Sequence, residues 1–180
     1  DGDGLEDLYV AQQGGVPNRL LMHQPDGTVR DRAEHGRVDF LDDTAGVLIL
    51  DLDGDGHRDL ALGIGPNVVL CYNDGEGVFA GRDLLRGPGA EQVYSLCAAD
   101  ADGDGDIDIY ATRYVAGGVS RGLPTPYHDA ENGAENLYWR NDGGRSYSLA
   151  TQEVGLDQNN TRFSLSAIWE DVDRDGDLDL

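Results

Sequence analysis

Short apolar runs with a period of two recur along the chain, separated by polar loops. In residues 60–65 the larger side chains Leu60, Leu62 and Ile64 alternate with alanine and glycine. In residues 109–114, the side chains at 110, 112 and 114 oppose those at 109, 111 and 113. A period of two is typical of β-strands, whose successive side chains point to opposite faces of a sheet. The pattern therefore predicts an all-β fold made of short strands.

Each alternating run is followed by an asparagine, a second apolar run and a turn. The chain reads N-R-L-L-M-H-Q-P-D-G from Asn18, N-V-V-L-C-Y-N-D-G from Asn67 and N-L-Y-W-R-N-D-G from Asn136. Turns of the P-D-G and N-D-G types are strong signals of a β-hairpin. A further β-prone run lies just before an acidic loop, at residues 47–50, 93–97 and 167–169. One period thus predicts four antiparallel strands.

Acidic loops of the form D-x-D-x-D-G-x-x-D separate the first and second strands of this pattern. The first loop, D-G-D-G-L-E-D at residues 1–7, lacks its first carboxylate. The second loop is D-L-D-G-D-G-H-R-D at 51–59, the third is D-A-D-G-D-G-D-I-D at 100–108, and the fourth is D-V-D-R-D-G-D-L-D at 171–179. The chain therefore contains an internal repeat that is marked by its acidic loops.

The spacing of the loops gives the repeat length. Between the aspartates at position 5 of successive loops it is 52, 49 and 71 residues. Four-stranded propeller blades recur at about 40 to 50 residues. We therefore expect a β-propeller of four-stranded antiparallel blades, in which residues 1–180 form a single partial domain of about three blades of a larger propeller. The approximate repeats are 1–46, 47–92 and 93–164, with the start of the next at 165–180. The chain begins and ends inside repeats, so we expect it to continue in a longer polypeptide.

Composition and charge narrow the classes of function. Hydrophobic residues make up 39% of the 180 residues, which excludes a disordered tail. The 26 glycines are typical of a chain with many tight turns. Acidic side chains outnumber basic ones 35 to 13, and the formal net charge is -22. This charge opposes binding to nucleic acid and to anionic lipid, and no apolar run is long enough to cross a bilayer. Cations are the expected partners, and we expect neither nucleic-acid binding nor membrane insertion.

The acidic loops have the ligand pattern of calcium sites. Ca²⁺ takes about 6 to 8 oxygen ligands, which carboxylates at positions 1, 3, 5 and 9 and a backbone carbonyl at position 7 can supply. The glycine at position 6 permits the bend that brings these oxygens together. We expect three complete Ca²⁺ sites and a fourth in the truncated first loop. The predicted metal ligands are Asp1, Asp3, Leu5, Asp7, Asp51, Asp53, Asp55, His57, Asp59, Asp100, Asp102, Asp104, Asp106, Asp108, Asp171, Asp173, Asp175, Asp177 and Asp179.

Two other calcium motifs do not match the sequence. An EF-hand requires a glutamate at position 12 and flanking helices, whereas position 12 is Leu62 or Ala111 here and the flanks are strand-like. Calcium-binding nonapeptide β-helices have a period far shorter than the spacing of these loops.

The segments D-L-D-G-D-G-H-R-D-L-A-L-G and D-V-D-R-D-G-D-L-D-L resemble the FG-GAP or VCBS repeats of integrin α-subunit propellers. Together with N-L-Y-W-R-N-D-G-G, the segment W-E-D-V-D-R-D-G-D-L-D-L is most similar to the repeats of the cartilage acidic protein family and its bacterial relatives. The resemblance implies blades around a central axis, commonly seven, with calcium in the loop between the first two strands of a blade. It also implies an extracellular or cell-surface setting.

Three functions are compatible with this sequence. The first is an extracellular adhesion or binding module for a protein or glycan, with calcium rigidifying the loops and with the insertion at 116–135 as a candidate contact surface. The second is a structural subunit of a calcium-stabilised assembly or fibre, through self-association or further blades. The third is part of a polysaccharide-active enzyme, for which His128 is the best of the four histidines as a catalytic candidate. Since no G-x-S-x-G, H-E-x-x-H or P-loop motif occurs, we expect no enzymatic activity.

A few further residues carry specific expectations. Cys71 and Cys97 form either two buried thiols or a disulfide between neighbouring repeats, and both alternatives stay open. Trp139 and Trp169 fall in strand patterns, which predicts packing between blades. Asn159 begins an N-N-T sequence that matches a glycosylation acceptor.

Overall fold

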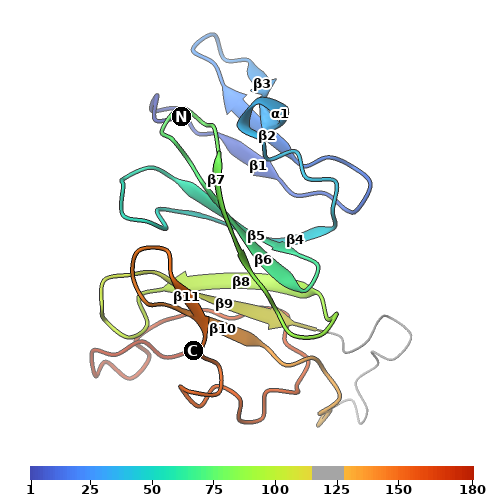
Figure 1. Ribbon diagram of the computed structural model, residues 1–180, viewed down its shortest axis with the longest axis vertical. Helices are drawn as coiled ribbons and strands as arrows, with labels where there is room; N and C mark the ends of the chain where they lie inside the picture. The colour runs from blue at the N-terminus through green and yellow to red at the C-terminus, as the bar shows by residue number, and fades with distance from the viewer. Residues whose placement is uncertain (115–127) are drawn as a thin grey trace.

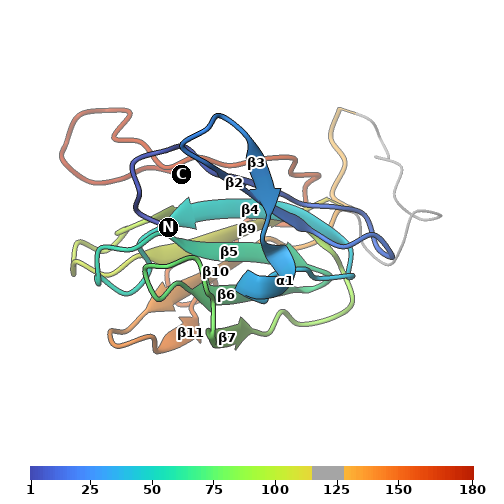
Figure 2. The same cartoon turned by 90° about the horizontal axis from the view of Figure 1, so that it is seen from above.

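The computed structural model describes residues 1–114 and 128–180, and almost all of its regular structure is β-strand. Three antiparallel sheets follow one another along the long axis of the molecule (Figure 1). Seen from above, the sheets lie over one another (Figure 2). The all-β prediction is confirmed.

The first sheet has three described strands in the order β1-β2-β3. These strands are β1 (Leu8–Val10), β2 (Arg19–His23) and β3 (Val29–Asp31). A single helical turn, α1 (Ala33–Gly36), leads from this sheet toward the second. It ends at Gly36, and the next residue, Arg37, caps it in the left-handed conformation with φ 61°.

The second and third sheets are four-stranded antiparallel meanders, as the repeat pattern predicts. The second sheet consists of β4 (Thr44–Leu50), β5 (Asp59–Ile64), β6 (Asn67–Tyr72) and β7 (Gly81–Leu85). The third sheet consists of β8 (Val93–Ala99), β9 (Asp108–Arg113), β10 (Leu137–Asn141) and β11 (Tyr147–Leu149). Each has the form of a propeller blade, and the described residues do not close a ring.

Because side chains alternate along β5, its two faces pack in two different hydrophobic cores. Leu60 and Leu62 pack against the first sheet, in a cluster with Tyr9, Leu20 and Met22 of β1 and β2. The opposite face of β5 contributes to a second cluster, which joins the second sheet to the third. Both faces of the strand are therefore buried, because a neighbouring sheet covers each of them.

Glycines allow the second and third sheets to approach closely. A Cβ atom added at Gly63 would lie 2.6 Å from Cγ1 of Val93, and one at Gly46 would lie 3.0 Å from Cγ of Leu96. These distances are shorter than normal carbon contacts. The small side chains of the alternating pattern thus bring β4 and β5 against the first strand of the third sheet.

Trp139 lies between two sheets, as expected, whereas Trp169 covers the outer face of the third sheet and lies in no described strand. Trp139 is 2% exposed in the core between the second and third sheets. Trp169 packs on the other side of the third sheet, where its ring lies edge-on to Tyr110 with centroids 6.3 Å apart.

Both cysteines are free thiols, so the disulfide alternative is not formed. Cys71 lies in the core between the first and second sheets, whereas Cys97 packs beyond the third sheet. The two side chains therefore belong to different layers. Burial raises the pKa of each thiol to about 11.

Two other segments differ from a simple repeat. The run at 167–169 forms no described strand, and only an isolated bridge pairs Glu170 with Asp179. Residues 116–127 of the insertion lie outside the described residues, while at its end Ala130 and Ala134 are buried. Within the described part of the chain, no helix has the length and apolar character needed to span a membrane.

Candidate metal centre

The acidic loops at 51–59 and 100–108 lie at one edge of the stacked sheets, on the left in Figure 1. Each joins the first strand of a sheet to the second. The β6–β7 and β10–β11 hairpin turns reach the same edge, because successive antiparallel strands reverse direction.

Position 9 of the second and third loops is tied to both the loop and the neighbouring hairpin. Asp59 is the first residue of β5 and has no exposed surface. Its Oδ2 accepts a hydrogen bond from the Leu52 N–H at 2.9 Å, and its Oδ1 accepts one from the Asn73 N–H at 2.8 Å. Burial raises the pKa of Asp59, although these two N–H groups oppose the shift.

The third loop repeats this arrangement and adds a side-chain donor. Asp108 accepts hydrogen bonds from the N–H groups of Ala101 at 3.0 Å and Asn141 at 2.8 Å. The Tyr138 hydroxyl donates a further bond to Oδ2 at 2.7 Å. Burial, reinforced by the adjacent carboxylate, raises the pKa of Tyr138. In the first loop, Asp7 accepts a bond from the His23 N–H at 3.0 Å, which is the same connection to the hairpin.

Position 1 is held by the glycine at position 6. The Oδ2 atoms of Asp51, Asp100 and Asp171 accept hydrogen bonds from the N–H groups five residues later, at 2.9, 2.9 and 3.2 Å. The glycines that donate them have φ angles of 90°, 96° and 98°. Only glycine adopts such angles without strain, which agrees with the predicted bend.

Position 4 also adopts a positive φ angle, which the sequence pattern did not reveal. Gly54 and Gly103 have φ 76°, and in the fourth loop Arg174 adopts φ 65°. The motif leaves this position open, because it is glycine in the first three loops and arginine in the fourth.

Position 5 forms a tight turn with position 7. Oδ1 of the aspartate at position 5 accepts a hydrogen bond from the N–H of residue 7 in all four loops, at distances of 2.8 to 3.0 Å. The side chains at position 7 take no part in this turn. Coordination through the carbonyls of Leu5, His57, Asp106 and Asp177 stays a prediction.

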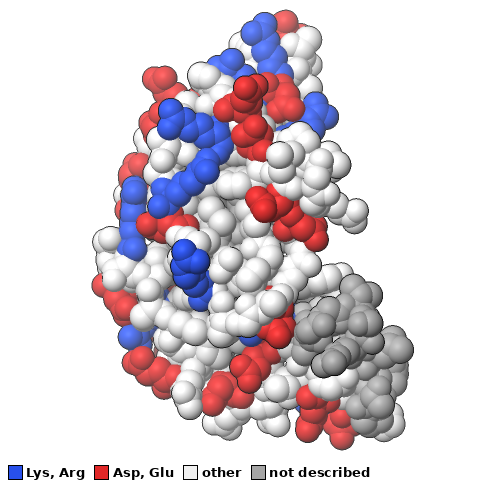
Figure 3. Space-filling model, turned by 45° about the vertical axis from the view of Figure 1, so that its right-hand side comes forward, with Lys and Arg blue, Asp and Glu red and all other residues white. Residues whose placement is uncertain are grey.

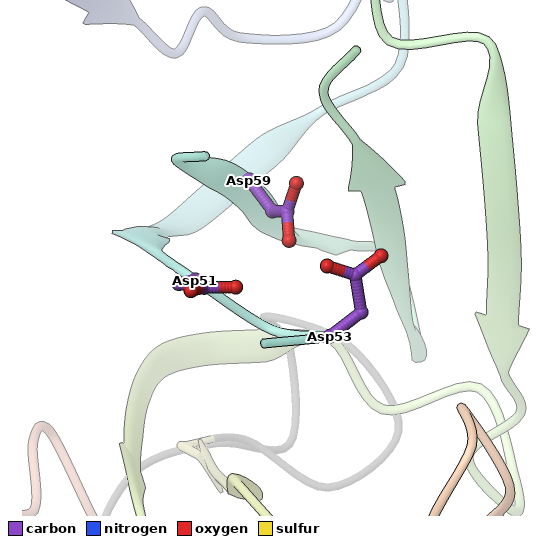
Figure 4. Close-up of side chains that lie close together, drawn as sticks. All are labelled: Asp51, Asp53 and Asp59. Atoms are coloured by element: carbon purple, nitrogen blue, oxygen red, sulfur yellow. The ribbon is translucent and has the colours of Figure 1, made fainter. Parts of the chain in front are cut away.

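Among the described residues, three groups of carboxylates come together closely enough to hold a metal ion. Within each group, ligand oxygens lie within 4.8 Å of one another. The groups are Asp51, Asp53 and Asp59; Asp100, Asp102 and Asp104; and Asp171, Asp173 and Asp179. Figure 4 shows the first group, in which side chains from the end of β4, the loop and the start of β5 surround a common space.

Other predicted ligands lie outside these groups. Asp55, Asp108 and Asp175 belong to the same loops but are not members. In the first loop, Asp1, Asp3 and Asp7 form no such group among the described residues.

The arrangement suits a hard cation. Oδ1 of Asp100 and Oδ1 of Asp171 are buried, and neither has a hydrogen-bond partner in the described part of the chain. Desolvation and the neighbouring carboxylates of Asp104 and Asp108 raise the pKa of Asp102. Buried acceptors without donors are costly, and a cation coordinated by them would offset that cost. All the atoms in these groups that could bind a metal ion are oxygens. The two cysteine thiols do not contribute, because they lie in the cores between and beyond the sheets.

The FG-GAP-like repeat model matches residues 1–62 and 51–111. The chain belongs to the FG-GAP-like repeat family. The first match contains the first and second loops, and the second match contains the second and third loops. A search of the curated proteins found no match.

The fourth loop lies beyond the matched FG-GAP-like repeats but has their geometry. Asp179 accepts a hydrogen bond from the Val172 N–H at 3.0 Å, as Asp59 does from Leu52. The same nine-residue pattern, the same bond from the glycine at position 6 and a carboxylate group are present. The structure therefore extends the repeated loop to residue 179.

The negative charge of the chain is distributed among several sites. On the face shown in Figure 3, acidic side chains occur in separate groups from one end of the molecule to the other. This distribution is expected if the acidic residues belong to repeated loops of successive sheets.

Sequence reasoning did not identify two kinds of residue that shape the loops. Asn73 and Asn141 begin the hairpin turns and donate their N–H groups to position 9. Arg145 reaches from the third sheet to form an ion pair with Asp53 of the second loop. The N-D-G turn motif marked the asparagines, but no pattern within one repeat could indicate a contact between sheets.

Proposed function

We propose that this chain is a calcium-binding part of an extracellular β-propeller that binds a protein or glycan partner. The observation that supports this most directly is the recurrence of one carboxylate arrangement at equivalent loops. Two of these loops contain a buried oxygen that has no hydrogen-bond donor among the described residues. Calcium would rigidify the edge where the acidic loops and the hairpin turns meet.

Calcium suits these loops better than magnesium does. Mg²⁺ requires nearly octahedral geometry and retains several waters, whereas Ca²⁺ accepts about 6 to 8 oxygens in flexible geometry. The loops can supply carboxylates at positions 1, 3, 5 and 9 as well as the carbonyl at position 7. Each bound dication would also remove two of the 22 net negative charges.

Bound calcium would convert repulsion into stabilisation. Two carboxylates about 4 Å apart repel by about 4 kcal/mol at an effective dielectric of 20. At free calcium 10 to 100 times the dissociation constant, each site adds roughly 1.4 to 2.7 kcal/mol to the free energy of unfolding. Successive loops would therefore stabilise the stacked sheets together.

Thermal unfolding with calcium, with magnesium and with a chelator tests this proposal, together with a count of bound metal. We expect a rise in Tm that is specific to calcium and a count of at least three ions. Asp100→Asn should reduce the rise, while Asp157→Asn, a matched charge change at an exposed position outside the loops, should not. A Tm that is indifferent to the chelator would reject the calcium assignment.

The proposed partner requires a separate experiment. We expect a screen of glycans and extracellular-matrix proteins to give binding that calcium strengthens and chelator weakens. Sedimentation of the calcium-loaded chain should give dispersed particles, whereas calcium-dependent fibres would favour the structural alternative.

The histidines and the acidic loops support a binding function better than a catalytic one. The four histidines lie on separate segments, and His128, the sequence candidate for catalysis, is exposed. The clustered carboxylates have a cation to bind. Cleavage of a glycan that is lost in His128→Ala would revive the enzymatic alternative.

A further inference from the structure

In the second loop, a side chain of the next sheet along the chain holds one of the carboxylates. Arg145, in the turn between β10 and β11, forms an ion pair with Asp53 at position 3 of this loop. The side chain of Asp53 is only 9% exposed. The Arg145 guanidinium also stacks on Tyr72 of β6, 3.7 Å from the ring centroid.

This arrangement places a protein cation beside the oxygens that a metal ion would use. The ion pair engages Oδ2 of Asp53, and the other oxygen accepts the Asp55 N–H at 3.3 Å. The loop is also more fully hydrogen-bonded at position 1. Asp51 accepts the Gly54 N–H through Oδ1 at 2.8 Å, whereas the Oδ1 atoms of Asp100 and Asp171 have no partner in the described residues.

The preceding interface lacks the arginine at the corresponding position. The turns that begin at Asn73 and Asn141 have the same hydrogen bonds, which aligns Gly77 with Arg145. A Cβ added at Gly77 would lie 3.9 Å from Cβ of Asp1, the position-3 aspartate of the first loop. The same point of two successive interfaces therefore carries glycine in one and arginine in the other.

The backbone at Arg145 also has the conformation of a glycine position. Its φ is 66°, close to the 79° of Gly77. Non-glycine residues are uncommon in this region, and the strain they carry is a basis for a functional hypothesis.

We propose that Arg145 is an internal competitor for the cation of the second loop. This inference rests on the calcium binding proposed above. Calcium must displace the guanidinium from Asp53 or share that carboxylate with it. The second loop therefore binds calcium more weakly than the third, and its loading is coupled to the contact between the second and third sheets.

The amides of the position-6 glycines allow each loop to be observed separately. In a calcium titration of the ¹⁵N-labelled chain, the signals of Gly56 and Gly105 report the second and third loops, because each N–H is bonded to the carboxylate at position 1. We expect the midpoint for Gly56 to lie at a calcium concentration about fivefold higher than that for Gly105, the upper end of what one partly exposed ion pair contributes.

Removal of the arginine should abolish this difference by changing the second loop alone. In Arg145→Gln we expect the Gly56 midpoint to fall about fivefold and the Gly105 midpoint to change by less than about twofold. Arg145→Gly should act in the same way and is compatible with the backbone angle. Arg140→Gln is the matched control, since it removes the same charge from the same sheet at a side chain paired with Asp142 and Glu153.

The unmodified chain gives a second measurement. The Nε–H signal of Arg145 should shift together with Gly56 and not with Gly105. A Gly56 midpoint that stays unchanged or rises in both Arg145 variants would overturn the inference, while calcium responses at Gly56 and Gly105 would leave the proposed function intact. If none of the glycines responds to calcium, both proposals fail.

Discussion

Asp108 is a charged side chain with no exposed surface, and three donors hold it in place. Two of them are backbone N–H groups, from the loop and from the next hairpin, and the third is the Tyr138 hydroxyl. These bonds offset the cost of burying the carboxylate. The residue therefore organises the loop before any cation binds.

Asp108→Asn should destabilise the chain even without metal. The amide keeps the shape of the side chain, but its NH₂ group cannot accept a hydrogen bond, which leaves at least one buried N–H unpaired. We expect the free energy of unfolding, measured in urea with chelator, to fall by about 2 to 3 kcal/mol. Asp106→Asn, at position 7 of the same loop, should change it by less than about 0.5 kcal/mol. Equal losses in the two variants would contradict the organising role of Asp108.

Much of the loop was predictable at the scale of single residues, because calcium ligation and tight turns place strict requirements on residue type. The glycine bend at position 6 was anticipated. The left-handed backbone at position 4 was not, since Arg174 stands where the second and third loops have glycine. Side-chain identity is an incomplete guide where tertiary contacts or the loop itself stabilise a strained angle.

At the scale of elements, small residues determine how closely the sheets approach. Gly63 lies on β5 opposite Val93, the first residue of β8, and Val93 is fully buried. A β-carbon at Gly63 has no room unless Val93 or its backbone moves. The contact thus links the second strand of one sheet to the first strand of the next.

A double-mutant cycle tests this contact. Gly63→Ala should reduce the free energy of unfolding by about 1 to 3 kcal/mol through overpacking, and Val93→Ala by about 2 to 4 kcal/mol through loss of buried methyl groups. Because the alanine methyl would fill part of the space that Val93 leaves, the double variant should lose at least about 1 kcal/mol less than the sum. Strict additivity in chemical denaturation would show that the two residues are not coupled.

The positions of the strands were more predictable than the packing between sheets. Alternation and turn motifs located the strands of the second and third sheets, since both signals are local in sequence. The same alternation could not show that both faces of β5 are covered, nor that Cys71 and Cys97 occupy different layers. The run at 167–169 has strand-like composition, but a strand also requires a hydrogen-bonded neighbour, and only one isolated bridge follows it.

At the scale of the whole molecule, the net charge of -22 is a source of instability that cations can relieve. The acidic loops recur on successive sheets, so their charges repel one another across the stack as well as within each loop. Repulsion between loops acts through solvent and is screened by salt, whereas repulsion within a loop acts over a few ångströms and is screened much less.

This difference predicts that salt and calcium have overlapping effects on stability. Raising sodium chloride from about 0.01 to 0.5 M shortens the screening length from about 30 Å to less than about 8 Å. With chelator present, we expect Tm to rise with salt because repulsion between loops is screened. With calcium bound, the loops are largely neutralised, so the same change in salt should raise Tm by a smaller amount. Circular dichroism melts at four combinations of salt and calcium measure both effects, with sucrose as the control for non-ionic stabilisation. An equal salt response in the two metal states would show that the acidic loops are not the main source of the repulsion.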